Sequence, residues 1–267
     1  MIKFISFGSG SDGNCYLLYT ENDGMLIDTG VGLRKLRNYF NENKLSLSMV
    51  KRVLITHDHA DHINSVGSFS NKYNVPIYTT QQVHDGINRN YSVSDKLKKE
   101  NTKYLTKGET VQLGDFSVTP FEVPHDSSDN VGYKIVCGDV VFCLMTDAGY
   151  VTDEMKEYIK VANYLVIEAN HDVSMLRDGH YSKYLKERIS GQGGHLSNND
   201  AAQALVENAT ECLHHVWLCH LSNENNHPEL ARKTIESVLR DHGIIVGVDF
   251  QLDVLPRTRP TVIFDLK

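Results

Sequence analysis

Several side chains that commonly bind metal ions stand together in one short segment, His57-Asp58-His59-Ala60-Asp61-His62. The segment directly follows Val53-Leu54-Ile55, an apolar run that predicts a buried strand. Its close spacing on a tight turn would let the first two histidines face one cation, and Asp61 with His62 a neighbouring one. The alternative is that these histidines face solvent or cap a helix. The pattern favours a two-ion site held at the rigid end of a strand.

Three more residues of ligand type each follow a predicted apolar strand. They are His125 after Phe121-Glu122-Val123-Pro124, Asp147 after the run 142–146, and His220 after the run 216–219. A single residue of this kind is often a capping group or a buried polar group with a local partner. Three of them in addition to the histidine segment favour further metal ligands.

The order of predicted elements indicates the fold class. In each half of the chain, apolar strands come first and helices follow. We expect strands at 3–7, 15–19, 25–28, 50–56, 77–79, 102–123 (several), 131–136, 140–146, 164–168, 215–220, 248–255 and 261–264. We expect helices at 33–41, from 62, and at 81–88, 153–159, 181–189, 199–208 and 228–242. Two such halves predict an α+β four-layer αββα sandwich, formed by a single domain over residues 1–267.

Composition supports a globular protein, because 40% of the 267 residues are hydrophobic and 23% are charged. The apolar runs are as long as strands and far shorter than the roughly 20 residues of a membrane helix. The N-terminal sequence has no signal-peptide pattern, so we expect a cytoplasmic protein without a membrane partner. Five cysteines, none in a CxxC pair, are expected to be reduced and mostly buried, and not to form a zinc site.

The order Asp28, HxHxDH, His125, Asp147, His220 resembles the ligand series of the metallo-β-lactamase superfamily over almost the whole chain. This resemblance implies two divalent ions, and carboxylate–histidine ligation suits Zn²⁺ or Mn²⁺. It assigns His57, His59 and His125 to one ion, and Asp61, His62 and His220 to the other. It makes Asp147 a bridge between the ions and Asp28 a support of the histidine segment. Asp58 is expected to orient this segment and not to bind metal.

Two further residues are similar to a pair in ribonuclease Z-like phosphodiesterases. Glu168 ends a predicted strand, and His195 lies in Gly194-His195-Leu196-Ser197-Asn198, just before a predicted helix. In those enzymes such a pair donates a proton beside the metals. The alternative for His195 is a helix N-terminal residue chosen for packing. We predict Glu168 and His195 as catalytic residues, together with Asp61 of the histidine segment.

Ordered motifs along the full chain resemble one particular family, the YycJ/VicX (WalJ) proteins. The motifs are 8–15, His125-Asp126 with Val131-Gly132-Tyr133, 146–149, 168–172, 194–198 and 220–222. The resemblance implies a 5′→3′ exonuclease acting on DNA. It also implies links to DNA repair and to a two-component signalling system.

The residues themselves support a DNA substrate less strongly than they support metal binding. The formal net charge is −7, and a negatively charged protein is repelled by the phosphate backbone of DNA unless its basic groups are gathered locally. Two basic groups, at Lys96, Lys98, Lys99, Lys103 and Lys107 and at Lys183, Lys186 and Arg188, either follow a phosphate backbone or are solvated helix faces. The candidates for binding the terminal phosphate of the DNA are His171, Ser127 and the segment 8–14. The alternatives are that His171 is a surface residue and that the segment 8–14 is only a tight turn.

Three functions therefore remain open, and a DNA nuclease is favoured. The second is a hydrolase of a small molecule, such as a cyclic phosphodiester, a thioester or a lactam. The third is a non-catalytic partner of a signalling complex, which the complete set of ligand-type residues disfavours.

Overall fold

The computed structural model describes residues 1–267, and the chain divides into two compact units. Unit 1 consists of Met1–Pro120, Ser127–Val131 and Pro256–Lys267. Unit 2 consists of Phe121–Asp126 and Gly132–Leu255. The single domain over residues 1–267 stays a prediction.

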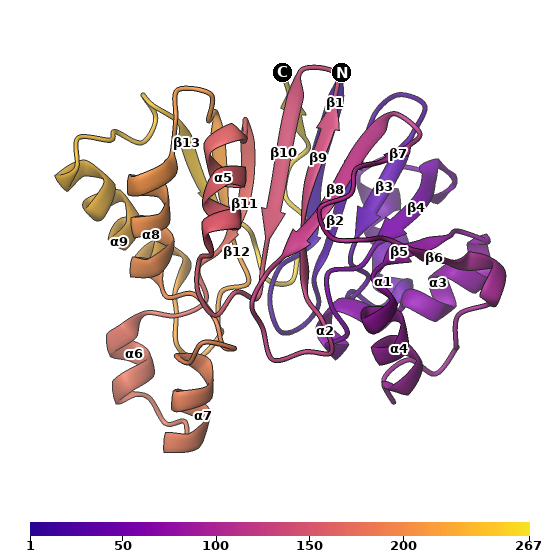
Figure 1. The fold of residues 1–267 in the computed structure, drawn as a ribbon, viewed down its shortest axis with the longest axis horizontal. Coiled ribbons are helices and arrows are strands. Elements are labelled where there is room, and N and C mark those ends of the chain that lie inside the picture. The colour runs from indigo at the N-terminus through magenta and orange to yellow at the C-terminus, as the bar shows by residue number, and fades with distance from the viewer. The chain divides into compact units, whose positions relative to one another are not determined.

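The sheet of unit 1 has seven strands in the order β14-β1-β2-β3-β4-β5-β6. These strands are β1 (Ile2–Gly8), β2 (Cys15–Tyr19), β3 (Gly24–Ile27), β4 (Val50–Leu54), β5 (Ile77–Thr79), β6 (Thr102–Tyr104) and β14 (Phe264–Leu266). Because β1 and β14 pair, both ends of the chain lie side by side (Figure 1). Strands β3 to β6 run parallel, so their carboxyl ends meet at one edge of the sheet.

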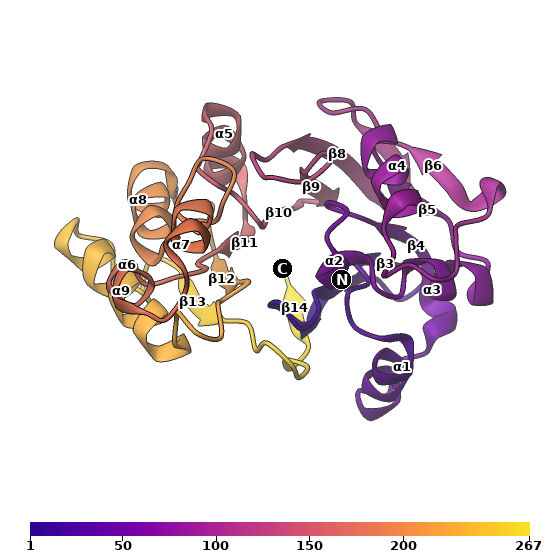
Figure 2. The same ribbon diagram turned by 90° about the horizontal axis from the view of Figure 1, so that it is seen from below.

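The helices of unit 1 cover one face of this sheet (Figure 2). They are α1 (Leu33–Glu42), α2 (Ala60–Ile63), α3 (Val66–Tyr73) and α4 (Gln81–Arg89), with short 3₁₀ helices at Leu47–Met49 and Lys99–Asn101. In α1, Leu36 and Phe40 stand four residues apart on the buried face, as helical periodicity requires. They join Phe69 of α3 and the strand residues Leu17 and Val53 in one hydrophobic core. An antiparallel hairpin, β7 (Val111–Leu113) with β8 (Phe116–Glu122), leads the chain toward unit 2.

The strands of unit 2 lie in the order β13-β12-β11-β10-β9. They are β9 (Val131–Cys137), β10 (Val140–Met145), β11 (Tyr164–Glu168), β12 (His215–Cys219) and β13 (Gln251–Val254). Strands β9 and β10 form the predicted antiparallel hairpin, in which Gly138 takes a left-handed φ of 59° at the turn. Strands β10 to β13 run parallel, so the residues that follow them lie at one edge.

Unit 2 has helices in two groups. The helices are α5 (Asp153–Val161), α6 (Val173–Asp178), α7 (Lys183–Ile189), α8 (Asn198–Asn208) and α9 (Pro228–Asp241). Helices α5, α8 and α9 cover one sheet face, where Met155, Leu205 and Ile235 pack with Leu165 and Leu218. Helices α6 and α7 lie beyond the ends of the strands (Figure 1).

The observed elements follow the predicted ones closely, with three differences. Helix α6 was not predicted, because six residues capped by Asp172 are too few for a periodic pattern. The last strand lies at Phe264–Leu266 and not at 261–264, since it is fixed by pairing with β1. Instead of one helix from residue 62, a short helix, α2, begins within the histidine segment, and a second helix, α3, follows it. None of the helices combines the length and the apolar composition that a membrane span requires.

Candidate active site

A buried carboxylate fixes the histidine segment in unit 1. Asp28 follows β3 in a left-handed conformation with φ 59°, which is uncommon outside glycine. Its Oδ2 lies 2.7 Å from His62 Nδ1, and its Oδ1 accepts the backbone N–H of Thr56 at 2.8 Å. Burial raises the pKa of Asp28, although its bonds to His62 and Thr56 oppose the shift. Asp28 thereby sets the ring orientation of His62 and makes its Nε2 an acceptor.

The four ligand-type side chains of the segment come together in the structure. The ring of His57 lies 4.1 Å from that of His62 and 4.7 Å from that of His59, measured between centroids. Helix α2 places Asp61 and His62 in its first turn, with His62 Nε2 3.6 Å from Asp61 Oδ2. Two donor atoms on one tetrahedral zinc ion lie about 3.4 Å apart, given bonds of about 2.1 Å. The distance between His62 Nε2 and Asp61 Oδ2 is therefore close to that of two ligands of one ion.

Asn14 is a residue of this region that the sequence did not reveal. Its Nδ2 lies 2.9 Å from His62 Nε2 and 3.3 Å from Asp61 Oδ2. Its Oδ1 accepts the N–H of Gly10 at 2.9 Å, which closes the segment 8–14 as a tight turn. The nearby Gly13, at φ 136°, is the one signal that the turn required a special residue.

Asp58 lies in the same segment and has a different set of contacts. Its carboxylate accepts hydrogen bonds from the backbone N–H and the Oγ of Ser128, at 3.0 and 2.6 Å. These contacts tie the histidine segment to the residues 127–131 of the same unit.

In unit 2, Asp147 and His220 stand at the ends of parallel strands. Both are buried and have left-handed backbones, with φ of 56° and 54°. Asp147 Oδ1 lies 3.4 Å from His220 Nδ1 and 3.9 Å from His125 Nε2. His125 Nδ1 donates to the carbonyl of Gly194 at 3.0 Å, which directs Nε2 toward Asp147. The distance between Asp147 Oδ1 and His125 Nε2 is near that of two ligands that share an ion.

Glu168, at the end of β11, connects the residues of this edge. Its Oε1 lies 2.8 Å from His195 Nδ1 and 3.0 Å from His220 Nδ1. Its Oε2 accepts the backbone N–H groups of Ala148 and Leu196, at 2.9 and 3.1 Å. Burial alone would raise the pKa of Glu168, but the two histidines lower it below its usual value.

His195 is the most exposed of these groups, and its pKa is shifted. Burial would lower the pKa of His195, but the carboxylates of Glu168 and Asp147 outweigh this effect and raise it above 6.5. An imidazole whose pKa is raised by two neighbouring carboxylates is suited to act as a general acid. Asp147, Glu168, His195 and His220 together also have the spacing of a metal-binding group. Geometry alone thus allows His195 to be either a proton donor or a ligand.

His171, for which the sequence left two roles open, is not a surface residue. Its side chain is 3% exposed, and residue 171 forms a parallel bridge with Ser197. The cysteines are all free, as expected, and Cys15, Cys143 and Cys219 are buried.

Comparison with known proteins defines the class. A family model described as "Beta-lactamase superfamily domain" matches residues 24–216. The metallo-β-lactamase fold protein YhfI from Bacillus subtilis has a TM-score of 0.71 at 18% identity, covering 97% of this chain and 98% of its own. The Zn²⁺-bound PqqB from Methylobacterium extorquens has a TM-score of 0.74 at 16% identity, covering 99% and 100%. The predicted αββα fold class is confirmed.

Curated relatives narrow the class further. The chain is 34% identical to "Exodeoxyribonuclease YycJ" of Bacillus anthracis, over 98% of both chains. It is 35% identical to "Exodeoxyribonuclease WalJ" of Streptococcus pneumoniae serotype 2 (strain D39), over 96% of this chain and 95% of the relative. The chain therefore belongs to the β-lactamase superfamily and, within it, to the YycJ/WalJ family.

Proposed function

We propose that the chain is a metal-dependent exodeoxyribonuclease that shortens DNA from its 5′ end. The observation that carries this proposal is the identity of about one third, over nearly the full length, to relatives named exodeoxyribonucleases. The Glu168–His195 pair supports it, since hydrolysis of a phosphodiester needs a proton for the departing oxygen. The cytoplasm stays the predicted location.

We further propose the metal ligands. They would hold two ions of Zn²⁺ or Mn²⁺, and the seven residues are His57, His59, Asp61, His62, His125, Asp147 and His220. The short distances from His62 to Asp61 and from His125 to Asp147 support this assignment. Bound ions of this kind lower the pKa of water toward neutrality and offset charge on the reacting phosphate.

The residues of the chain have separate tasks in this scheme. Asp28 and Gly194 orient His62 and His125 through the Nδ1 atom of each ring. Glu168 holds His195 in place and raises its pKa, which favours the protonated form. His195 then donates its proton to the departing 3′ oxygen. Asp61, beside His62 and Asn14, is proposed to orient the attacking water.

Ion pairs distinguish the basic residues that can contact DNA phosphates from those that are already neutralised. Lys107 forms an ion pair with Asp129, and Arg188 forms a two-bond pair with Asp126. Lys183 is nine-tenths exposed, and its partner Glu187 is 3.7 Å away, which makes a weak surface contact. We therefore assign phosphate contact to Lys183 and Lys186 of α7 in preference to Lys107 and Arg188.

The test is a gel assay with linear DNA labelled at the 3′ end and supplied with Mn²⁺ or Zn²⁺. We expect progressive shortening from the 5′ end, slower at high salt because phosphate contacts weaken. DNA with a blocked 5′ end should resist. If all DNA stays intact while a cyclic phosphodiester or a thioester is hydrolysed, the small-molecule alternative replaces this proposal.

A further inference from the structure

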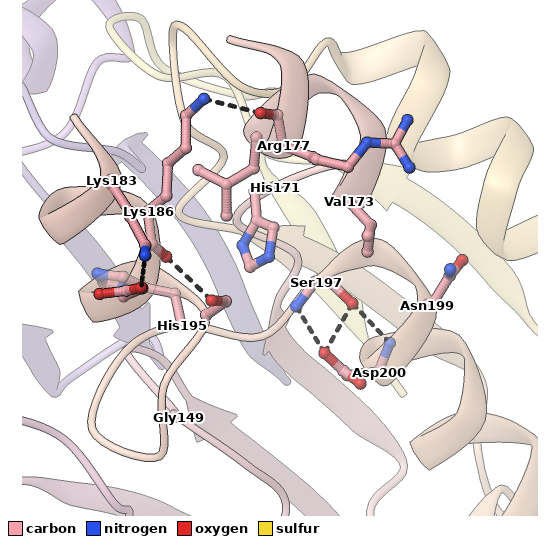
Figure 3. A pocket seen from close by; sticks show the side chains of 13 residues that line it. Gly149, His171, Val173, Arg177, Lys183, Lys186, His195, Ser197, Asn199 and Asp200 are labelled. Carbon is pink, nitrogen blue, oxygen red and sulfur yellow. Dashed lines mark hydrogen bonds and ion pairs between the residues drawn. The ribbon is translucent and has the colours of Figure 1, made fainter. Parts of the chain in front are cut away.

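Unit 2 contains a pocket beside His195. It lies among α6, α7 and the first residues of α8, and its cavity volume is about 570 Å³ (Figure 3). This is far more than a phosphate group needs, and it falls within the range of about 300–1,000 Å³ typical of pockets for whole small molecules. The pocket therefore has room for a nucleotide.

The wall formed by α6 and α7 carries more basic than acidic side chains. Lys183, Lys186 and Arg177 line this wall of the pocket together with one acidic residue, Glu187. Arg177 is paired with Asp178 through two hydrogen bonds, so the two lysines are the cations considered for an anion. The Lys186 ammonium donates to the backbone carbonyl of Arg177 at 2.7 Å, and this partner does not neutralise it. Lys183 has only the distant pairing with Glu187, so an anion in the pocket can compete for it. Phosphate is an anion that these lysines suit.

A buried histidine in the same pocket has an unused polar atom. His171 lines the pocket and is only 3% exposed (Figure 3). Its Nδ1 atom has no hydrogen-bond partner. A buried nitrogen without a hydrogen-bond partner is destabilising, and a ligand that bonds to it removes this cost. The backbone holds the residue firmly, because its carbonyl accepts the N–H of Asn198 at 2.9 Å.

We propose that this pocket binds the 5′-terminal nucleotide of the DNA, with its 5′-phosphate among Lys183, Lys186 and His171. The inference rests on the proposed function, in which His195 protonates the departing 3′ oxygen. Since His195 lines this pocket, the nucleotide that carries this oxygen lies on the pocket side. In cleavage from a 5′ end, that nucleotide is the terminal one.

The reaction that follows releases one mononucleotide at a time. The oxygen of water bonds to the phosphorus, and the P–O3′ bond breaks with its electron pair on O3′. O3′ takes the proton of His195, the proton lost by water passes to solvent, and His195 is protonated again from solvent. The products are a 5′-mononucleotide with a free 3′-hydroxyl and a shortened strand with a new 5′-phosphate.

The first experiment compares one oligonucleotide with a 5′-phosphate and with a 5′-hydroxyl, using the metal-loaded enzyme. The wild type should prefer the phosphorylated end about tenfold in kcat/KM, mainly through KM, and release mononucleotides. Lys183→Gln, Lys186→Gln and His171→Ala should each bring this preference toward one. His171→Asn should restore part of it, because the asparagine amide can occupy the place of Nδ1.

The matched control is Lys233→Gln on α9. Like Lys183, Lys233 is an exposed helix lysine paired with a glutamate four residues away, Glu229 at 3.4 Å, but it lies outside this pocket. This variant should keep the wild-type preference. A preference that is absent in the wild type, or that persists in Lys186→Gln and in both His171 variants, overturns the inference.

A second experiment tests the pocket without DNA cleavage. Deoxyadenosine 5′-monophosphate is titrated into the metal-loaded protein by calorimetry, with deoxyadenosine as the comparison. We expect the monophosphate to bind, and to bind about tenfold more weakly to Lys186→Gln. No binding, or equal binding to both proteins, overturns the inference. Binding by a protein that leaves all DNA intact supports a nucleotide pocket and contradicts only the exonuclease proposal.

Discussion

Glu168 Oε1 lies 2.8 Å from His195 Nδ1, and the same oxygen lies 3.0 Å from His220 Nδ1. The carboxylate is fully buried, and its other oxygen is held by two backbone N–H groups. One side chain thus fixes the ring orientations of a proposed proton donor and a proposed metal ligand. The two histidines should nevertheless differ in what their loss does, because only His220 is assigned to an ion.

Removal of His195 and of Asp147 should separate these roles. The wild type should contain two metal equivalents per chain by elemental analysis. His195→Ala should keep both and slow turnover by about 10²–10⁴-fold, the usual contribution of a positioned general acid. Asp147→Ala should lose metal and nearly all activity. Loss of metal in His195→Ala would make His195 a ligand and contradict the proposed proton donor.

The pH dependence of kcat should reflect the pKa of His195, which Glu168 shifts. A proton donor works while it is protonated, so activity is present below the pKa of His195 and lost as pH rises through it. Because Glu168 and Asp147 raise this pKa, the alkaline limb of the kcat profile should lie above pH 6.5. Glu168→Gln removes the largest raising influence and should move the limb to lower pH. An alkaline limb that does not move in this variant would assign it to another group.

The strand-end residues could be predicted from the sequence because two simple patterns coincide. An apolar run marks a buried strand, and the polar residue after it must lie at the edge of the sheet. Parallel pairing then aligns Asp147, Glu168 and His220, since Met145 lies opposite Ile167 and Glu168 opposite Cys219. The sequence therefore predicts that these side chains lie at one edge of a sheet.

Contacts that depend on long-range packing could not be predicted in this way. Asn14 reaches His62, 48 residues away, through a turn whose shape the sequence does not specify. His171 is buried because its backbone pairs with Ser197, which no periodic pattern reveals. The left-handed backbones of Asp28, Asp147 and His220 were equally hidden, since propensity disfavours them and the surrounding structure imposes them.

The cysteines should differ sharply in reactivity toward a thiol reagent. Burial raises the pKa of Cys143 to about 12 and that of Cys15 and Cys219 above the ordinary range. The thiolate is the reactive form, so at neutral pH the exposed Cys212 should react first. Titration with Ellman's reagent should show one fast thiol in the native protein and five after unfolding in denaturant. Fast reaction that persists in Cys212→Ser would contradict this order.

The packing of Gly30 against the histidine segment leads to a prediction with a close control. A Cβ atom on Gly30 would lie 1.6 Å from the carbonyl oxygen of Asp61, a backbone atom that has to move. The same region is tied by hydrogen bonds from Gly30 N to Asn14 O and from Asn14 N to Asp61 O, at 2.9 and 2.8 Å. Gly30→Ala should therefore displace Asp61 and lower the free energy of unfolding by about 1–3 kcal/mol.

Because Asp61 is a proposed ligand, Gly30→Ala should also reduce metal content, which elemental analysis measures alongside thermal unfolding. Gly32→Ala, two residues away, is the control, since a Cβ there meets no atom within 4 Å. Its effect should stay below about 1 kcal/mol, the scale of a changed helix N-cap, with both metal equivalents kept. Equal metal content in the two variants would show that the position of Asp61 does not control ion binding, and would remove it from the proposed ligand set.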